Sequence, residues 1–156
     1  MVETSDQWIT ERTGIKNRFL VGPGETCSDL GARATLDACQ KAGVDPADIE
    51  LIVFATITPD MMLPATACLV QHKIGATRAW GFDLSIACSG FLYALQVGVQ
   101  FILSGCHKNV LVIGMDVMSS IVDYQDRQTC IIFGDGGGAV LLQPSESASD
   151  GCFVDY

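Results

Sequence analysis

The sequence predicts an α/β domain in which a mostly parallel sheet is flanked by helices. Three continuous apolar runs of strand length, at residues 51–57, 110–115 and 139–142, indicate strands that are covered on both faces. Segments with a helical pattern separate these runs, and such alternation is typical of folds with parallel strands. At 156 residues the chain is about the size of one domain.

The predicted helices have recognisable start and stop residues. Thr4 or Ser5 can cap a short first helix that ends at Gly14, and a second helix starts after Ser28 and stops at Gly43. The other predicted elements are an acidic turn at residues 45–48, helices at residues 64–74 and 89–104, a strand at residues 79–84, and an exposed loop at residues 144–151.

The composition is apolar for a chain that stands alone in water. Hydrophobic residues make up 49% of the sequence and charged residues 17%, and the mean hydropathy is +0.33. Such a chain either has a large core or shares apolar surface with a partner. No uninterrupted apolar stretch reaches the roughly 20 residues that cross a bilayer, so we expect no membrane span.

The charge balance argues against nucleic acid as a partner. Nine basic and eighteen acidic residues give a net charge of -9, which disfavours non-specific binding to phosphates. The polar, acidic start MVETSDQW lacks the basic and apolar regions of a signal peptide. We therefore expect a cytoplasmic protein.

Cysteine usage indicates reduced thiols and no metal site. The seven cysteines are odd in number and show no CxxC spacing, so a disulfide framework, a zinc site or a redox protein has little support. For any one of them the plain interpretation is a small buried hydrophobic residue.

Cys88 is the exception that the local sequence singles out. The segment FDLSIACSGFLYALQ places it between an extended run and a long apolar helix. Its sulfur would then lie near a helix N-terminus, where unpaired N–H groups favour a thiolate nucleophile. Small residues around it leave room for a substrate. The local sequence leaves open that Cys88 simply packs beneath the sheet.

Three separated segments carry a family resemblance. TSDQWITERTGI, DLSIACSGF and DRQTCIIFGDGGGAVLL resemble the β-ketoacyl-acyl carrier protein synthase III family, which are condensing enzymes of the thiolase superfamily, in the same order and at similar spacing. The resemblance implies that residues 1–156 form the amino-terminal half of a layered αβαβα thiolase-like fold. It also implies that the first strand and the whole second half are missing.

The resemblance implies an acyl transfer reaction that begins fatty acid biosynthesis. The cysteine at the position of Cys88 would accept an acyl group from acyl-CoA. It would then pass the group to the carbanion formed when malonyl-acyl carrier protein loses carbon dioxide. The products would be β-ketoacyl-acyl carrier protein, carbon dioxide and CoA. The family acts as a homodimer, and acyl-CoA is a substrate rather than a bound cofactor.

The same resemblance assigns binding roles to five other residues. Trp8 would stack on the CoA adenine, Arg127 would cover its other face, and Arg12 would hold the CoA phosphates. Leu63 and Phe133 would line the acyl pocket, with Leu63 closing the pocket of the neighbouring subunit. The family often has an aromatic residue where Leu63 stands, so the preferred acyl chain is left open. Outside these motifs, Trp8 would be a helix anchor and the two arginines surface charges.

Two other features are given plainer interpretations. The stretch GDGGGAVLL is not a GxGxxG motif after a strand, so we expect a close backbone approach rather than a dinucleotide site. His72 and His107 do not match the family's catalytic histidine, and we expect both at the surface. In the family, that histidine and a catalytic asparagine lie in the second half, so we expect this chain alone to lack condensing activity.

Two alternatives remain. The first is a related thiolase-superfamily acyltransferase with a different acceptor, such as a hydroxymethylglutaryl-CoA synthase. The second is a non-catalytic fragment that only binds CoA or dimerises. The second alternative predicts that Cys88 is no more reactive than the other six cysteines.

Overall fold

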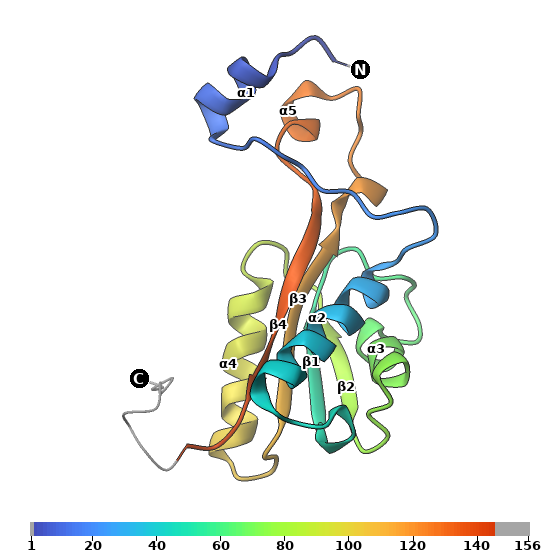
Figure 1. Cartoon of the computed structure of the whole chain (residues 1–156), viewed down its shortest axis with the longest axis vertical. Coiled ribbons are helices and arrows are strands. Elements are labelled where there is room, and N and C mark those ends of the chain that lie inside the picture. Colours follow the sequence, from blue (N-terminus) through green and yellow to red (C-terminus); the bar gives the residue numbers. More distant parts are fainter. Residues whose placement is uncertain (1, 146–156) are drawn as a thin grey trace.

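The chain forms a four-stranded sheet in the order β2-β1-β3-β4, described by a computed structural model over residues 2–145. The strands are β1 (Leu51–Ala55), β2 (Trp80–Leu84), β3 (Val110–Val117) and β4 (Asp135–Leu142). β1 runs parallel to both β2 and β3, whereas β4 is antiparallel to β3 (Figure 1). The predicted mostly parallel α/β sheet is therefore confirmed.

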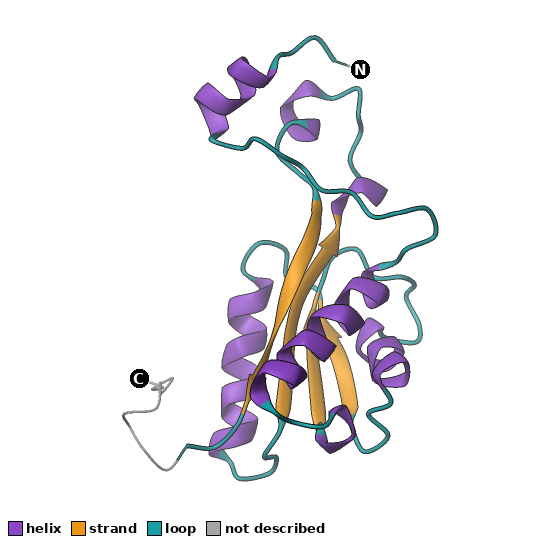
Figure 2. Ribbon diagram, in the orientation of Figure 1, coloured by secondary structure: helices purple, strands orange, loops and turns teal. Residues whose placement is uncertain are grey.

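Helices cover both faces of the sheet. α2 (Cys27–Ala42) and α3 (Thr66–Ile74) pack on one face, and α4 (Gly90–Leu103) packs on the other (Figure 2). α1 (Asp6–Thr13) and α5 (Arg127–Cys130) lie together beyond the carboxyl ends of the parallel strands (Figure 1). Two short 3-10 turns, Pro46–Asp48 and Met118–Ser120, complete the described elements.

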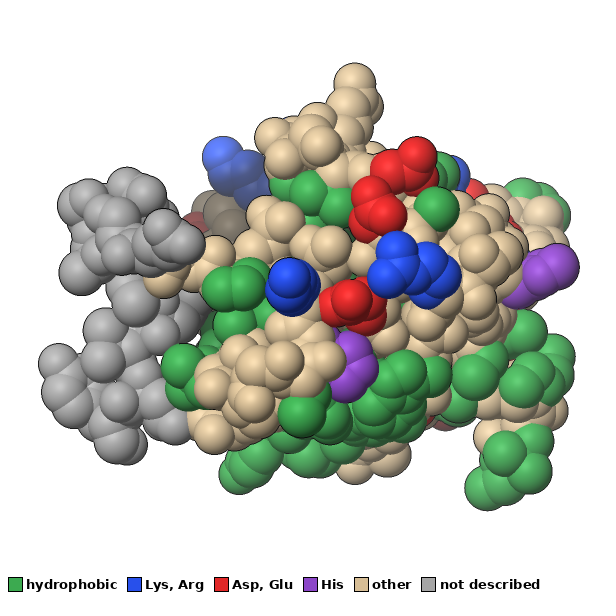
Figure 3. Space-filling model, turned by 90° about the horizontal axis from the view of Figure 1, so that it is seen from below, with side chains coloured by type: hydrophobic (Ala, Val, Ile, Leu, Met, Phe, Trp, Pro, Cys, Tyr) green, Lys and Arg blue, Asp and Glu red, His purple; other side chains and the backbone are tan. Residues whose placement is uncertain are grey.

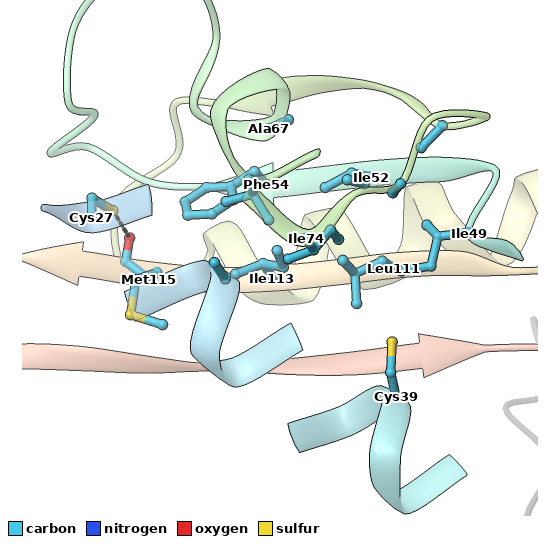
Figure 4. Packing of buried hydrophobic residues seen from close by; sticks show 14 of the residues in the cluster. Cys27, Cys39, Ile49, Ile52, Phe54, Ala67, Ile74, Leu111, Ile113 and Met115 are labelled. Carbon is cyan, nitrogen blue, oxygen red and sulfur yellow. Dashed lines mark hydrogen bonds between the residues drawn. The ribbon is translucent and has the colours of Figure 1, made fainter. Parts of the chain in front are cut away.

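Alternate side chains of the central strands fill two separate cores. On the α2 and α3 face the buried cluster includes Cys27, Cys39, Ile52, Phe54, Leu111, Ile113 and Met115 (Figure 4). On the α4 face it includes Leu51, Val53, Ala55, Ala94, Val110, Val112 and Leu142. Because successive strand residues point to opposite faces, a continuous apolar run is the pattern that a doubly covered strand requires.

Helix caps were predicted more accurately than helix and strand lengths. Ser5 caps α1 by accepting the N–H of Trp8 at 3.2 Å, and Gly14 ends that helix with a positive φ of 72°. α2 starts at Cys27, slightly before the predicted start, and ends before Gly43 as predicted. α3 and β1 are each two residues shorter than predicted. The predicted loop at residues 144–151 is exposed at Pro144 and Ser145, and the remainder lies outside the described residues.

β4 begins four residues earlier than the expected start at residue 139, because its glycines allow a close approach to β3. Gly137 pairs with Met115, and Gly138 pairs with Gly114. A Cβ atom on Gly137 would lie 2.6 Å from the Cα of Met115 and would also overlap the Gly114 carbonyl. The close backbone approach predicted for GDGGGAVLL is therefore confirmed at Gly137.

The outer face of α4 is apolar and exposed. Leu92, Tyr93 and Leu103 of this helix are all exposed. Figure 3 shows hydrophobic side chains gathered along one side of the molecule when it is seen from the end opposite α1. Exposed apolar surface of this extent marks contact with another surface. Within residues 2–145, no helix is both long enough and apolar enough to cross a membrane.

Gly137→Ala should destabilise the fold because the new methyl group meets backbone atoms that cannot move away. We expect the free energy of unfolding to fall by about 2 kcal/mol or more, as for an overpacked core. Gly136→Ala is the matched control, because its added Cβ meets nothing within 4 Å. Urea denaturation followed by circular dichroism measures both variants, and equal stability of the two would contradict the close approach.

Candidate active site

Cys88 lies in the loop that joins the carboxyl end of β2 to the start of α4. The side chain is exposed and stands two residues before Gly90, the first residue of α4. The predicted junction between a strand and a helix is therefore confirmed, and the alternative that Cys88 packs beneath the sheet is wrong. A cavity of about 170 Å³ beside it is lined by Ala55, Ala87, Cys88, Phe91, Gly114, Met115, Asp116 and Gly136.

Asp116 is a polar residue of this cavity that sequence reasoning missed. Its Oδ1 atom accepts hydrogen bonds from Thr56 Oγ1 at 2.9 Å, the N–H of Ile57 at 2.8 Å and Thr58 Oγ1 at 3.1 Å. These bonds tie the carboxyl end of β3 to the segment that leaves β1. The available signal was a carboxylate within the apolar run that forms β3, but its partners lie far away in the sequence.

Trp8, Arg12 and Arg127 meet although they come from opposite ends of the described chain. The Cζ atoms of Arg12 and Arg127 lie 4.3 Å and 4.0 Å from the centre of the Trp8 ring. Both helices that carry them lie beyond the same sheet edge from which the Cys88 loop leaves (Figure 1). Neither arginine forms an ion pair with any residue between 2 and 145. Their charges are therefore available to an anionic ligand.

Leu63 and Phe133 do not line the cavity beside Cys88. Leu63 is exposed in the segment between β1 and α3. Phe133 lines a different cavity of about 260 Å³, together with Ile9, Tyr124 and other residues. The assignment of both residues to an acyl pocket therefore stays a prediction.

The described cysteines range from exposed (Cys88 and Cys106) through half-buried (Cys68 and Cys130) to buried (Cys27 and Cys39). Cys27 is buried, and its Sγ lies 3.5 Å from the Met115 carbonyl oxygen, to which it donates (Figure 4). Desolvation by burial raises the pKa of the Cys27 thiol to about 12. Cys39 is also buried, and desolvation raises its pKa as well, whereas Cys106 is exposed. The plain interpretation of cysteine as a core residue is thus confirmed for Cys27 and Cys39.

The two histidines lie apart from this site. His72 is exposed near the end of α3, as expected. His107 is half-buried. Its Nε2 accepts a hydrogen bond from Trp80 Nε1 at 3.0 Å, and its ring packs against Phe101. The expected surface position is therefore confirmed for His72, whereas His107 is only partly exposed. Among residues 2–145, no three His, Cys, Asp or Glu side chains are grouped so as to hold a metal ion.

Sequence comparison links the chain to one enzyme family. Residues 82–154 match the family described as 3-oxoacyl-[acyl-carrier-protein] synthase III. The chain is 56% identical over 156 residues to the β-ketoacyl-[acyl-carrier-protein] synthase III of Koribacter versatilis, covering 100% of this chain and 47% of that protein. The corresponding protein of Solibacter usitatus is 52% identical over 157 residues, with the same coverage. The chain thus spans about half the length of the curated relatives it matches.

Solved structures give the same result for the fold. The crystal structure of 3-oxoacyl-[acyl-carrier-protein] synthase III from Aquifex aeolicus matches with a TM-score of 0.90 and 48% identity, covering 93% of this chain and 47% of that chain. The priming β-ketosynthase of the R1128 polyketide pathway matches with a TM-score of 0.89 and 39% identity, covering 93% and 43% of the two chains. The predicted thiolase-like fold is therefore confirmed.

Thiol alkylation should follow the burial of the cysteines. In the native chain we expect iodoacetamide to modify Cys88 and Cys106 first. Cys27 and Cys39 should react at rates at least roughly tenfold lower, because buried thiols are inert. Time-resolved peptide mass mapping measures each site, and denatured chain is the control in which the difference should vanish. Fast labelling of Cys27 in the native chain would contradict the described packing.

Proposed function

We propose that the chain is part of a β-ketoacyl-acyl carrier protein synthase III, which its relatives and the family match support, and that Cys88 accepts an acyl group from acyl-CoA in a condensing reaction. The observation that carries the proposal is the exposed thiol at the start of α4, beside its own small cavity. An exposed cysteine at a helix N-terminus has the access and the local N–H groups that nucleophilic catalysis uses.

The proposed reaction has two steps, and the acyl group is bound to the Cys88 sulfur between them. The Cys88 thiolate attacks the thioester carbonyl of acyl-CoA, and CoA leaves as a thiolate that takes up a proton. Malonyl-acyl carrier protein then loses carbon dioxide, and the electron pair left on its carbon attacks the acyl group. The carbon–sulfur bond to Cys88 breaks, so that β-ketoacyl-acyl carrier protein is released and the thiolate is restored.

The cluster of Trp8, Arg12 and Arg127 supports a nucleotide site for CoA. An indole ring and planar guanidinium groups are well suited to stack on adenine, and arginines without an ion-pair partner among the described residues suit the CoA phosphates. Arg127 already lies 4.0 Å from the Trp8 ring centre, which leaves no room for a third ring between them. Adenine would need a gap of about 7 Å, twice the normal contact distance, so Arg127 must move aside on binding.

Condensation requires groups that this chain does not place at Cys88. Within the described residues, neither a histidine nor an asparagine lines the cavity beside the thiol. We infer that residues 1–156 are a half-domain and that a second half supplies the groups that stabilise the carbanion. The exposed apolar face of α4 supports this inference, because it offers a surface for that half to cover.

The proposal includes a homodimer in the cytoplasm, with Leu63 of one subunit reaching the acyl pocket of its neighbour. Support for the subunit contact comes from the exposure of Leu63 and from β2, which is an edge strand of the described sheet.

A second candidate function is acyl transfer to a different acceptor, and the likeness to a polyketide priming β-ketosynthase favours it. Turnover with malonyl-acyl carrier protein by the two-half protein separates the two functions.

Acetyl-CoA should acylate Cys88 selectively. We expect peptide mass mapping to find the acetyl group on Cys88, and we expect the label to disappear in Cys88→Ala. Cys106→Ala is the matched control, because Cys106 is equally an exposed cysteine but lies after α4 rather than before it. Equal labelling of Cys88 and Cys106 would indicate non-specific thiol chemistry and would support a non-catalytic fragment.

Removing the stacking residues should weaken CoA binding. Trp8→Ala and Arg127→Ala should each raise the Kd for CoA roughly five- to a hundredfold, because a base–aromatic stack is worth about 1–3 kcal/mol. Arg78→Ala is the control for loss of positive charge, since Arg78 pairs with Asp48 and Glu50 instead. Isothermal titration calorimetry measures the three variants. If all of them bind CoA equally well, the site lies elsewhere.

A further inference from the structure

Residues 61–63, here called the tip segment, project three apolar side chains into solvent. The exposed fractions are 48% for Met61, 93% for Met62 and 84% for Leu63. The tip segment lies in the loop between β1, which ends at Ala55, and α3, which begins at Thr66. Because so little of its surface is packed against the core, its position depends on the residues that hold its two ends.

Asp60 holds the upstream end of the tip segment. Its Oδ1 accepts the N–H of Ser28 at 2.9 Å, and its Oδ2 accepts the Ser28 hydroxyl at 2.5 Å. Ser28 is completely buried in the first turn of α2. A carboxylate in this position is favoured by the unpaired N–H groups and the dipole of the helix. The segment is thus attached to a fixed point in the core.

Lys73 completes this anchor from α3. Its Nζ donates to Ser28 Oγ at 2.7 Å and pairs with Asp29 Oδ1 at 2.5 Å. The ammonium group therefore lies beside the serine hydroxyl that donates to Asp60. A hydrogen bond from Lys73 lowers the pKa of Asp29 to about 2, so the Asp29 carboxylate stays ionised at neutral pH. The anchor joins α2, α3 and the end of β1.

Asp83 holds the downstream end. It is a residue of β2, and its two carboxylate oxygens accept the N–H groups of Thr66 at 2.6 Å and Ala67 at 2.8 Å. These are the first two residues of α3, whose N-cap residue Ala65 makes no side-chain cap of its own. Asp83 therefore replaces the missing cap and ties the end of the tip segment to the strand that leads to Cys88.

We propose that Asp60 and Asp83 are positioning residues that clamp the tip segment at both ends and so set how far Leu63 enters the acyl pocket of a neighbouring subunit. This inference rests on the proposed function, because it takes Leu63 as the residue that closes that pocket. With both ends fixed, only residues 61–65 lie between the two anchors. The clamp then determines pocket depth, and pocket depth selects the length of the acyl chain.

Limited proteolysis with thermolysin tests the clamp without any assay of function. Thermolysin cuts before apolar residues, and cleavage needs the segment to leave its anchored position. Asp60→Ala should be nicked within residues 60–64 at least about tenfold faster than the unaltered chain, and Ser28→Ala, a milder change, should fall between them. Asp37→Ala is the matched control, because it removes an exposed carboxylate of α2 whose ion pair within the described residues is with Lys41. An unchanged nicking rate in both Asp60→Ala and Ser28→Ala overturns the proposal.

Acyl-chain selectivity tests the second part of the inference. The ratio of Cys88 labelling by octanoyl-CoA to labelling by acetyl-CoA should change at least about fivefold in Asp60→Ala and in the same direction as in Leu63→Ala. Asp60→Asn, which keeps one oxygen acceptor for Ser28, should restore part of the ratio. Faster nicking with an unchanged ratio overturns the link to selectivity. An unaltered chain that takes no label at Cys88 contradicts the proposed function, while the nicking rate still decides the clamp.

Discussion

The burial of β1 on both faces is the constraint on which the candidate site depends. Leu51, Ile52, Val53 and Phe54 are all buried, two toward each core, so the strand cannot shift or rotate without opening one of them. The segment that leaves its carboxyl end inherits this fixed position. Asp116 braces that segment against β3, and the Cys88 cavity lies between the two strands and the start of α4. The positions of the residues at the candidate site are therefore fixed by the apolar core beneath it.

Aspartates hold the carboxyl edge of the sheet together. Asp60, Asp83, Asp116 and Asp135 each accept hydrogen bonds from a segment distant in sequence. Some of the excess acidic residues therefore make hydrogen bonds inside the fold instead of serving only as solvated surface charges. Burial alone would raise the pKa of Asp135, but hydrogen bonds from Ser119 and Val21 outweigh it and the net pKa is lowered. Such a carboxylate stabilises the fold at pH values above the pKa that it has in the unfolded chain. This contribution is lost as the pH falls through the lower pKa that it has in the folded chain. Acid should therefore weaken the links that Asp135 makes to Ser119 and Val21.

Local patterns predicted the layers of the fold but not its cross-links. The apolar runs that became β1 and β3 were visible because periodicity is a property of neighbouring residues. α5 was missed because four residues are too few to show a helical period. The bonds of Asp60 to Ser28 and of Asp116 to Thr56 were missed because nothing local connects these partners. That Trp8 and Arg127 belong to one site was expected only through family resemblance, which placed them on opposite faces of an adenine, and their direct contact was not foreseen.

Cys27 and Cys88 show why a helix N-terminus is insufficient evidence for a reactive cysteine. Cys27 is the first residue of α2, so the reasoning from helix dipole and unpaired N–H groups applies to it as well as to Cys88. Yet Cys27 is buried, and desolvation raises its pKa to about 12, which leaves a protonated thiol with no route for a substrate. Cys88 differs because its sulfur is exposed beside a cavity. Exposure, which the sequence does not report, is what separates a candidate nucleophile from a core residue at the same kind of helix position.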